Sequence, residues 1–231
     1  MIDQNIKIAV DAIVFGYQSN QLFVLLVKQK FGPLKDTWCL PGGFVREDEG
    51  LEQAVIRELD EETGITVNYL EQLYTFGDDL NRDPRFRTIS VAYFALADPS
   101  KLVLKTITDT DADKAQWFSI DELPKLGYDH LEITQAALKR LKNKLSYQPI
   151  GFDLLPSLFP FSELENLYTT ILSNEIDRRN FRKKILSFGF IEETDQYETS
   201  KTGRPAKLFR FNKEKYKAIN EDKFLFEIKF V

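Results

Sequence analysis

Short runs of apolar, β-branched residues dominate the beginning of the chain. Residues 7–17 (KIAVDAIVFGY) and residues 22–28 (LFVLLVK) are two such runs, and the turn-prone pair Ser19-Asn20 lies between them. Two β-rich runs on either side of a short polar turn are typical of a β-hairpin. The pattern therefore predicts a hairpin at the start of the chain that joins a larger sheet.

The middle of the chain continues with strand-like patterns. Apolar residues alternate over residues 66–77, and residues 88–97 (TISVAYFALA) form a strongly apolar run, so each is a predicted strand. A further strand is expected over residues 115–118. Residues 119–123 are typical of the start of a short helix, which Pro124 would end.

A helix is predicted over residues 51–62, and its apolar face continues in carboxylates. At roughly 100° per residue, one face holds the apolar Leu51, Ala54 and Val55 and then the acidic Glu58, Glu61 and Glu62. Unpaired carboxylates turned toward a protein interior are costly, so a cation should neutralise them. Carboxylate oxygens suit a hard ion such as Mg²⁺. The pattern thus predicts a metal site, with a solvated acidic helix face as the alternative.

The pattern changes at residues 146–151 (SYQPIG), whose Pro and Gly are typical of a domain boundary. We therefore predict one domain over residues 1–146 and a second over residues 147–231.

The second segment has the pattern of two short helices followed by two strands. Ser162 can cap a helix over residues 163–172, and a second, basic helix is expected over residues 177–188. The two strands are expected at residues 191–196 and 207–211, with the loop 199–206 (TSKTGRPA) between them. This order of elements is typical of a winged helix-turn-helix.

Charge is distributed unevenly between the two segments. The 231 residues carry a formal net charge of −5 at pH 7. Residues 147–231 hold 14 Lys and Arg against 13 Asp and Glu, a net charge of +1, so residues 1–146 carry −6. Within residues 178–217 the balance is 12 basic to 5 acidic, or +7. This basic segment coincides with the predicted helix-turn-helix and favours a nucleic-acid partner over an ordinary solvated helix surface.

Composition excludes several other classes of protein. No stretch approaches the roughly 18 consecutive apolar residues of a membrane span, and the first residues lack the pattern of a signal peptide, so we expect a cytoplasmic protein. Cys39 is the only cysteine and His130 the only histidine, which excludes an intrachain disulfide and the usual four-ligand zinc site. His130 opens a predicted helix over residues 131–144, where we favour a capping or packing role over a catalytic one.

The spacing around the acidic helix resembles a known motif. Residues 43–65 (GFVREDEGLEQAVIRELDEETGI) are similar to the Nudix box at its nine fixed positions, which are Gly43, Glu49, Arg57, Glu58, Leu59, Glu61, Glu62, Gly64 and Ile65. The resemblance implies an α+β fold, with a Nudix α/β/α sandwich and a mixed sheet in the first domain. It also implies that Glu58, Glu61 and Glu62 hold Mg²⁺ or Mn²⁺, while Glu49 and Arg57 orient them.

Nudix enzymes cleave a nucleoside diphosphate linked to another group. Metal ions neutralise the pyrophosphate, and a carboxylate-activated water attacks phosphorus. The resemblance therefore gives Arg57 and the three metal-binding glutamates a catalytic role. The glycines of the preceding Pro41-Gly42-Gly43 let the backbone turn sharply and approach a ligand, so Gly42 and Gly43 are candidate ligand contacts together with Glu49.

A loop rich in arginine lies between the predicted strands 66–77 and 88–97. The segment DDLNRDPRFR resembles the RDPR loop of Nudix proteins that handle ADP-ribose and of their regulatory relatives. Guanidinium groups suit bidentate capture of phosphate or carboxylate. We therefore predict Arg82 and Arg85 as ligand contacts, with a solvated connection as the alternative.

The second segment resembles the carboxy-terminal domain of the Nudix-related, NrtR-like transcriptional regulators, and GRPAKLFRF resembles their wing. The resemblance implies that the basic helix enters the major groove and that cationic side chains neutralise phosphates. The candidate DNA-binding residues are Arg178, Arg179, Arg182, Lys183, Lys184, Arg204 and Lys207. Because one winged helix touches few base pairs, we expect a homodimer on a double-stranded operator.

These observations favour a DNA-binding transcriptional regulator whose Nudix domain binds, and with an intact box hydrolyses, ADP-ribose or a related nucleotide sugar. One alternative is a Nudix pyrophosphatase that converts ADP-ribose to AMP and ribose 5-phosphate and uses its second domain only for interaction. The other is a regulator that senses sugars without catalysis.

Overall fold

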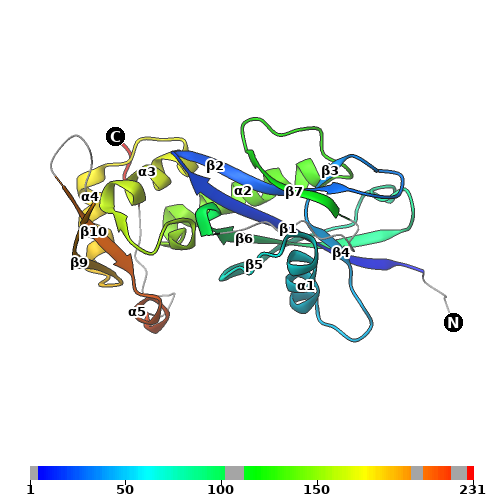
Figure 1. Cartoon of the computed structure of the whole chain (residues 1–231), viewed down its shortest axis with the longest axis horizontal. Helices are drawn as coiled ribbons and strands as arrows, with labels where there is room; N and C mark the ends of the chain where they lie inside the picture. The colour runs from blue at the N-terminus through cyan, green and yellow to red at the C-terminus, as the bar shows by residue number, and fades with distance from the viewer. Residues whose placement is uncertain (1–4, 102–111, 199–204, 220–227) are drawn as a thin grey trace. The chain divides into compact units, whose positions relative to one another are not determined.

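The computed structural model describes residues 5–101, 112–198, 205–219 and 228–231 (Figure 1). The chain divides into two compact units. The first runs to Gln18 and continues with Leu22–Lys139, and the second combines Ser19–Gln21 with Arg140–Val231. The described part contains no helix with the length and apolar character of a membrane span.

The first unit is built on a seven-stranded mixed sheet with strand order β3-β2-β1-β6-β5, in which β4 also pairs with β1 and β7 with β2. The strands are β1 (Lys7–Gln18), β2 (Gln21–Gln29), β3 (Trp38–Cys39), β4 (Gly42–Phe44), β5 (Tyr69–Phe76), β6 (Thr88–Ala97) and β7 (Ala112–Ser119). The neighbours β1 and β6 are parallel, whereas the pairs of β4 with β1, β3 and β7 with β2, and β5 with β6 are antiparallel. The mixed sheet implied by the resemblance is confirmed.

The predicted hairpin at the start of the chain is confirmed. Strands β1 and β2 are neighbours in the sheet, and the turn residues Ser19 and Asn20 have φ angles of 51° and 60°. Two left-handed residues in succession are the geometry of the tight hairpin turn that matches the twist of paired strands. The strands predicted over residues 66–77, 88–97 and 115–118 are confirmed as β5, β6 and β7.

The prediction of a short helix over residues 119–123 is wrong. The backbone here continues the pairing with β2, since the Ile120 amide donates to the Leu22 carbonyl at 2.9 Å. A single turn follows, in which the Glu122 amide donates a hydrogen bond to the Ser119 carbonyl at 3.1 Å. Pro124 then lacks the amide that a further helical turn would need.

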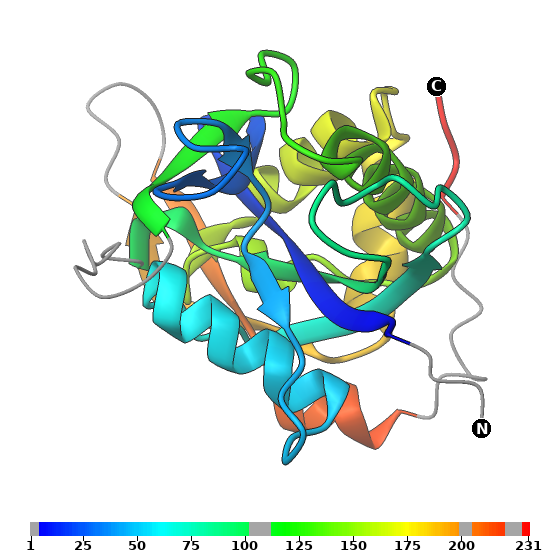
Figure 2. The same ribbon diagram turned by 90° about the vertical axis from the view of Figure 1, so that its right-hand side faces the viewer.

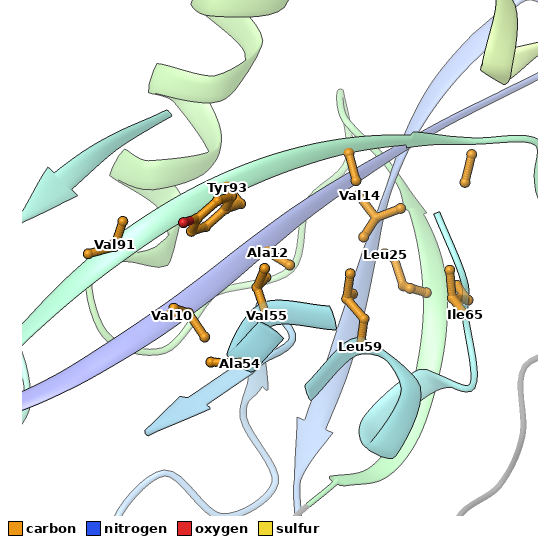
Figure 3. Close-up of a cluster of buried hydrophobic side chains, with 12 residues drawn as sticks. Val10, Ala12, Val14, Leu25, Ala54, Val55, Leu59, Ile65, Val91 and Tyr93 are labelled. Atoms are coloured by element: carbon orange, nitrogen blue, oxygen red, sulfur yellow. The ribbon is translucent and has the colours of Figure 1, made fainter. Parts of the chain in front are cut away.

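Helix α1 (Leu51–Thr63) packs its apolar stripe on one face of the sheet. Ala54, Val55 and Leu59 are buried in a cluster with alternate residues of β1 and β6, among them Val10 and Tyr93 (Figure 3). Gly64 ends the helix in the left-handed region, with φ 69°. The predicted helix 131–144 is confirmed as α2 (His130–Tyr147), which lies on the other side of the sheet from α1 (Figure 2).

The second unit contains the predicted pair of helices and β-hairpin. Its helices are α3 (Phe161–Leu172), α4 (Arg178–Ser187) and α5 (Lys213–Ala218), and its strands are β8 (Phe159–Pro160), β9 (Ile191–Glu198) and β10 (Ala206–Phe211). The sheet is antiparallel with order β8-β10-β9. This winged helix-turn-helix confirms the predicted fold class, while most of the wing loop, residues 199–204, lies outside the described residues.

The N-cap of α3 differs from the prediction, which assigned it to Ser162. Ser162 lies inside the first turn of α3, and the N-cap is Pro160, which provides no side-chain cap. Asp177 caps α4, because its side chain accepts a hydrogen bond from the Asn180 amide at 3.1 Å. The predicted break between the helices is confirmed at Ser173, whose φ is 55°. The described residues also contain two 3₁₀ turns, Pro99–Lys101 and Phe152–Leu154.

Aromatic side chains form much of the core of the second unit. Tyr168 is fully buried, and its hydroxyl donates to the Ile150 carbonyl at 2.8 Å. The Phe161 ring contacts the Phe209 ring edge to face at 5.4 Å, which joins α3 to β10. These contacts give the small unit a core of its own, with α4 held on it by the buried Ile185.

Leu59→Ala should lower the free energy of unfolding by about 2–5 kcal/mol, because it leaves a cavity between α1 and the sheet where Leu59 is 1% exposed. The matched control is Ile56→Ala, since Ile56 lies on the same helix and is 46% exposed. That change should alter stability by no more than about 0.5 kcal/mol. Urea unfolding of both variants measures the difference, and equal losses would contradict the packing of α1.

Candidate functional site

The Nudix box and the arginine loop line one pocket of the first unit, with a volume of about 750 Å³. The structure brings together eight of the predicted site residues around it: Gly42, Gly43, Arg57, Glu58, Glu61, Glu62, Arg82 and Arg85. Glu49 is not part of the pocket wall but contacts Arg57 directly. Segments separated along the chain therefore form a single concave site of the size that binds small molecules.

Arg57 holds the acidic side chains of the box. Its guanidinium donates two hydrogen bonds to the Glu49 carboxylate, at 2.8 and 2.6 Å. It also donates to Glu58 at 2.7 Å, to Glu61 at 3.1 Å and to the Phe44 carbonyl at 3.2 Å. One guanidinium thus neutralises carboxylates from the loop and from α1, and these contacts are compatible with the positioning role implied by the resemblance.

These contacts shift the pKa values of the box residues. The hydrogen bonds from Arg57, with the Arg46 amide, lower the pKa of Glu49 to about 2. Burial raises the pKa of Glu58, and the charge of Arg57 opposes that shift only in part. The glutamates raise the pKa of Arg57 well above its usual range, against the effect of burial. Arg57 therefore remains a fixed cation beside an anionic Glu49.

The two glycines before the helix have no room for a side chain. A Cβ atom on Gly43 would lie 2.2 Å from Glu58 Oε1, and one on Gly42 would lie 2.2 Å from the Val10 carbonyl oxygen. The Gly42 amide also donates to Glu62 Oε2 at 2.9 Å. Glycine is required at position 42 because the Val10 backbone cannot move aside, whereas a side chain at position 43 would displace the Glu58 carboxylate.

The three glutamates are not equally buried. Glu62 is 6% exposed and the Glu58 side chain is 13% exposed, and both residues line the pocket. The Glu61 side chain is 39% exposed and pairs with Arg46 at 3.2 Å as well as with Arg57 at 3.1 Å. Among the described residues, no group of three or more His, Cys, Asp or Glu side chains is arranged to hold a metal ion. The donors are the hard oxygens that a divalent ion such as Mg²⁺ prefers, but Arg57 and Arg46 engage two of the three carboxylates.

Arg82 is buried beneath the pocket and paired with acids. It donates to Asp129 Oδ2 at 2.8 Å through Nε and to Asp129 Oδ1 at 2.7 Å through Nη2. Nη2 also lies 3.4 Å from Asp11 Oδ2. Its side chain is only 4% exposed. These bonds anchor the arginine loop to β1 and to the start of α2.

Arg85 is the more accessible arginine of the loop, with a side chain that is 40% exposed. It makes two hydrogen bonds to Asp83, at 3.0 and 2.9 Å. Its guanidinium carbon lies 5.4 Å from the centre of the Phe44 ring and 5.7 Å from the centre of the Tyr128 ring. Burial raises the pKa of Tyr128 to about 12, so its hydroxyl stays protonated at neutral pH.

Asp11 and His130 belong to the pocket and were missed as site residues. Burial alone would raise the pKa of Asp11, but His130, Ser90 and Arg82 lower it to about 2. His130 Nε2 lies 3.4 Å from Asp11 Oδ1. Burial acts to lower the pKa of His130, but Asp11 raises it to about 10, so the Asp11 carboxylate favours a protonated ring. The Leu40 amide donates to Nδ1 at 2.9 Å and opposes this effect, because that hydrogen bond needs an unprotonated Nδ1.

The sequence carried a signal for one of the missed residues. Asp11 is a lone acid within the apolar run KIAVDAIVFGY, and a buried carboxylate in a strand needs partners. His130 is buried at the start of α2, which fits the packing role that we favoured, and it also faces the pocket. No local pattern marks Phe44 or Tyr128, because each reaches the pocket only through the fold.

The basic residues of α4 differ in their surroundings. Arg178 lies 3.7 Å from Glu165, and the Arg182 guanidinium lies 4.5 Å from the centre of the Phe161 ring. Arg179 and Lys183 are exposed and form no ion pair with any described residue. These two cations are therefore the most available for an external anion.

The other candidate DNA contacts are partly neutralised or lie outside the described residues. Lys184 Nζ lies 5.3 Å from the centre of the Phe188 ring. Lys207 on β10 pairs with Glu193 on β9 at 2.6 Å. Arg204 falls within residues 199–204 and so lies outside the described residues.

Comparisons with known proteins agree with both units. Residues 6–147 match the NUDIX domain, and residues 151–211 match the NrtR DNA-binding winged helix domain. The ADPR responsive transcriptional repressor NtrR of Acinetobacter baylyi is 36% identical over 211 residues, which cover 90% of this chain and 82% of that protein. The ADP-ribose pyrophosphatase of Methanocaldococcus jannaschii is 40% identical over 128 residues, which cover 54% of this chain and 69% of that protein.

Two crystal structures of Shewanella oneidensis NrtR are also similar. The protein complexed with a 27mer DNA has a TM-score of 0.79 and 30% identity, and the match covers 97% of this chain and 99% of that chain. Its NUDIX domain complexed with ADP ribose has a TM-score of 0.54 and 36% identity, covering 61% of this chain and 90% of that chain.

The fold and the pocket define a protein that combines a Nudix domain with a winged-helix domain of the DNA-binding type. The matches to the family models and to the Acinetobacter baylyi repressor cover both units. The chain belongs to the NrtR family.

Glu49→Gln should destabilise the protein most at neutral pH. The pKa of Glu49 is about 2 in the folded chain against an ordinary value of 4.5, so its charge stabilises the fold above pH 4.5. That stabilisation is lost as the pH falls from 4.5 toward 2, so the wild type and Glu49→Gln should converge on acidification. Urea unfolding at a series of pH values measures the difference.

The control for this experiment is Glu52→Gln, because Glu52 is a nearby carboxylate that is exposed on the first turn of α1. Its effect should be small at every pH. A loss of stability in Glu49→Gln that does not change with pH would contradict the role of the Glu49 charge.

Proposed function

We propose that this protein is a DNA-binding transcriptional repressor that responds to ADP-ribose. The observation that supports this most directly is the single pocket lined by the intact Nudix box and by Arg82 and Arg85. The match of the whole chain to an NrtR structure that holds DNA supports the second half of the proposal.

The pocket has the chemistry that a nucleotide sugar needs. The pyrophosphate of ADP-ribose is an anion, and Arg46 and Arg85 present guanidinium groups at the pocket with side chains that are 57% and 40% exposed. Guanidinium groups bind phosphate oxygens in a bidentate manner. Arg82 is held by Asp129, so we assign it to the support of the loop and give the direct phosphate contact to Arg85.

Helix α4 supplies the proposed DNA contacts. Arg179 and Lys183 lie on its exposed surface, and Arg182 rests on the aromatic rings of Phe161 and Phe209. Phosphate neutralisation by such residues provides affinity and a strong dependence on salt. We further propose that two copies of the chain bind one operator, because one winged helix reads only a few base pairs.

A response to ADP-ribose requires that the ligand bind the DNA-competent and DNA-free arrangements with different affinity. Coupling energies of this kind are typically about 1–3 kcal/mol, or roughly 5- to 150-fold in affinity. ADP-ribose should therefore weaken the binding of operator DNA by a factor in that range.

Hydrolysis of ADP-ribose is a second candidate function of the same pocket. It is favoured by the match to the box at all fixed positions and by the similarity to an ADP-ribose pyrophosphatase. Glu58, Glu61 and Glu62 would hold Mg²⁺, which when bound neutralises the pyrophosphate and lowers the pKa of water. A box carboxylate would take the proton of the water that attacks phosphorus. Cleavage of the pyrophosphate then releases AMP and ribose 5-phosphate.

The double change Arg179→Ala and Lys183→Ala should weaken DNA binding and reduce the slope of log affinity against log salt by about 2, one for each lost phosphate contact. Fluorescence anisotropy with DNA from the upstream region of its own gene, over a salt series, measures both quantities. The control is Lys213→Ala, because Lys213 already pairs with Asp153 at 2.8 Å. The proposal fails if the wild type gives no salt-dependent binding with or without ADP-ribose.

For hydrolysis, Glu62→Gln should reduce release of AMP from ADP-ribose about 100-fold or more, and chelation of Mg²⁺ should abolish it. The matched control is Glu52→Gln, which changes an exposed carboxylate of the same helix outside the pocket. Equal turnover in Glu62→Gln and the wild type would remove Glu62 from catalysis. An absence of turnover in the wild type, with ADP-ribose binding intact, would identify a sensor without hydrolysis.

A further inference from the structure

We infer that residues 228–231 are a positioning segment for DNA binding, because they hold the start of α4, the helix proposed to enter the major groove. This inference rests on the proposed binding of DNA. It deepens that proposal by adding a segment that lies beyond residues 151–211, the part of the chain that matches the winged helix domain.

Main-chain hydrogen bonds join residues 228–231 to the turn between α3 and α4. The Asp177 amide donates to the Lys229 carbonyl at 2.8 Å, and the Val231 amide donates to the Glu175 carbonyl at 3.0 Å. A reciprocal pair of bonds of this kind is the pattern of two short antiparallel strands. The segment therefore runs beside the turn and fixes the path of its backbone.

Two buried isoleucines strengthen this contact. Ile176 in the turn is 3% exposed and forms the antiparallel bridge with Phe230, and Ile228 is 7% exposed. Burial of such side chains removes apolar surface from water and stabilises the contact. Val231 is 91% exposed, so its side chain buries little and its amide is the group that contributes. The segment is therefore held both by packing and by hydrogen bonds.

The contact acts on the residue that begins α4. Asp177 is the N-cap, and its side chain accepts a hydrogen bond from the Asn180 amide at 3.1 Å while its own amide is bound to the Lys229 carbonyl. The first two helical residues are Arg178 and Arg179. In a helix-turn-helix, residues at the N-terminal end of the second helix contact base edges. A shift of the N-cap would therefore move these cations relative to the duplex.

Support of the turn before DNA arrives has a thermodynamic consequence. Ordering of a backbone segment costs conformational entropy, and a cost that is met on folding does not reduce the affinity for a ligand. The apparent affinity falls in proportion to the fraction of molecules in the competent arrangement. Residues 228–231 should therefore raise affinity for the operator without contacting a base.

The test releases the segment without changing any charge. In the double variant Ile228→Ala and Val231→Pro, the first change removes buried apolar surface, and proline has no amide to donate to Glu175. Fluorescence anisotropy on the full chain compares DNA from the upstream region of its own gene with a scrambled duplex of the same length. Affinity for the upstream DNA should fall about 10-fold or more. Affinity for the scrambled duplex should fall less than about 2-fold, because phosphate contacts need no exact register.

The matched control is Ile228→Val with Val231→Ala, which keeps most of the apolar surface and the amide. It should change affinity for the upstream DNA by less than about 3-fold. Val231→Pro alone removes one hydrogen bond and should weaken binding of the upstream DNA about 2- to 10-fold. This single variant keeps the inference testable if the double variant fails to fold.

Equal weakening of both duplexes in Val231→Pro and in the double variant would mean a structural role only and would overturn the inference. Unchanged binding of the upstream DNA in both variants would overturn it as well, with the proposed function left standing. If the wild type gives no salt-dependent binding of the upstream DNA, the proposed function fails and the positioning role fails with it.

Discussion

The bidentate pairing of Arg57 with Glu49 is the interaction on which the site depends. The pocket gathers many carboxylates into a partly desolvated space, and each would be costly without a cation beside it. Arg57 supplies one positive charge to Glu49, Glu58 and Glu61 at distances of 2.6 to 3.1 Å. Because the guanidinium also bonds the Phe44 carbonyl, the same residue fixes β4 against α1. Charge neutralisation and the shape of the pocket therefore have a common origin.

A second charged network organises the opposite wall of the pocket. Asp11 on β1 lies between Arg82 of the arginine loop and His130 at the start of α2, and Asp129 completes the set. Asp11, Arg82 and His130 are buried and Asp129 is partly buried, so each removed partner would leave an uncompensated charge. The network explains why Arg82 and Arg85, which are close in sequence, have different tasks. One is committed to holding the loop, and the other remains accessible to a ligand.

Much of the fold could be predicted from the sequence, because the elements follow from local periodicity. The hairpin, the strands β5 to β7 and helix α1 depend on alternation, turn residues and the glycine at position 64. The helix-turn-helix was equally visible, since its apolar positions have helical spacing. The short helix at residues 119–123 failed because pairing of Ile120 with Leu22 outweighed a weak local preference. The prediction that Ser162 caps the helix failed because α3 begins two residues earlier than predicted, at Phe161.

By itself the sequence determined the chemistry of the site, since the Nudix box places Arg57 and its glutamates within one short segment where spacing dictates which side chains share a helix face. Only the tertiary structure decided which of them meet partners from elsewhere. Arg82 and Asp129 are 47 residues apart, and Leu40 and His130 are 90 apart. The same holds for Phe44 and Tyr128, which reach one pocket from different elements. Such contacts depend on sheet order and loop path, which no local pattern encodes.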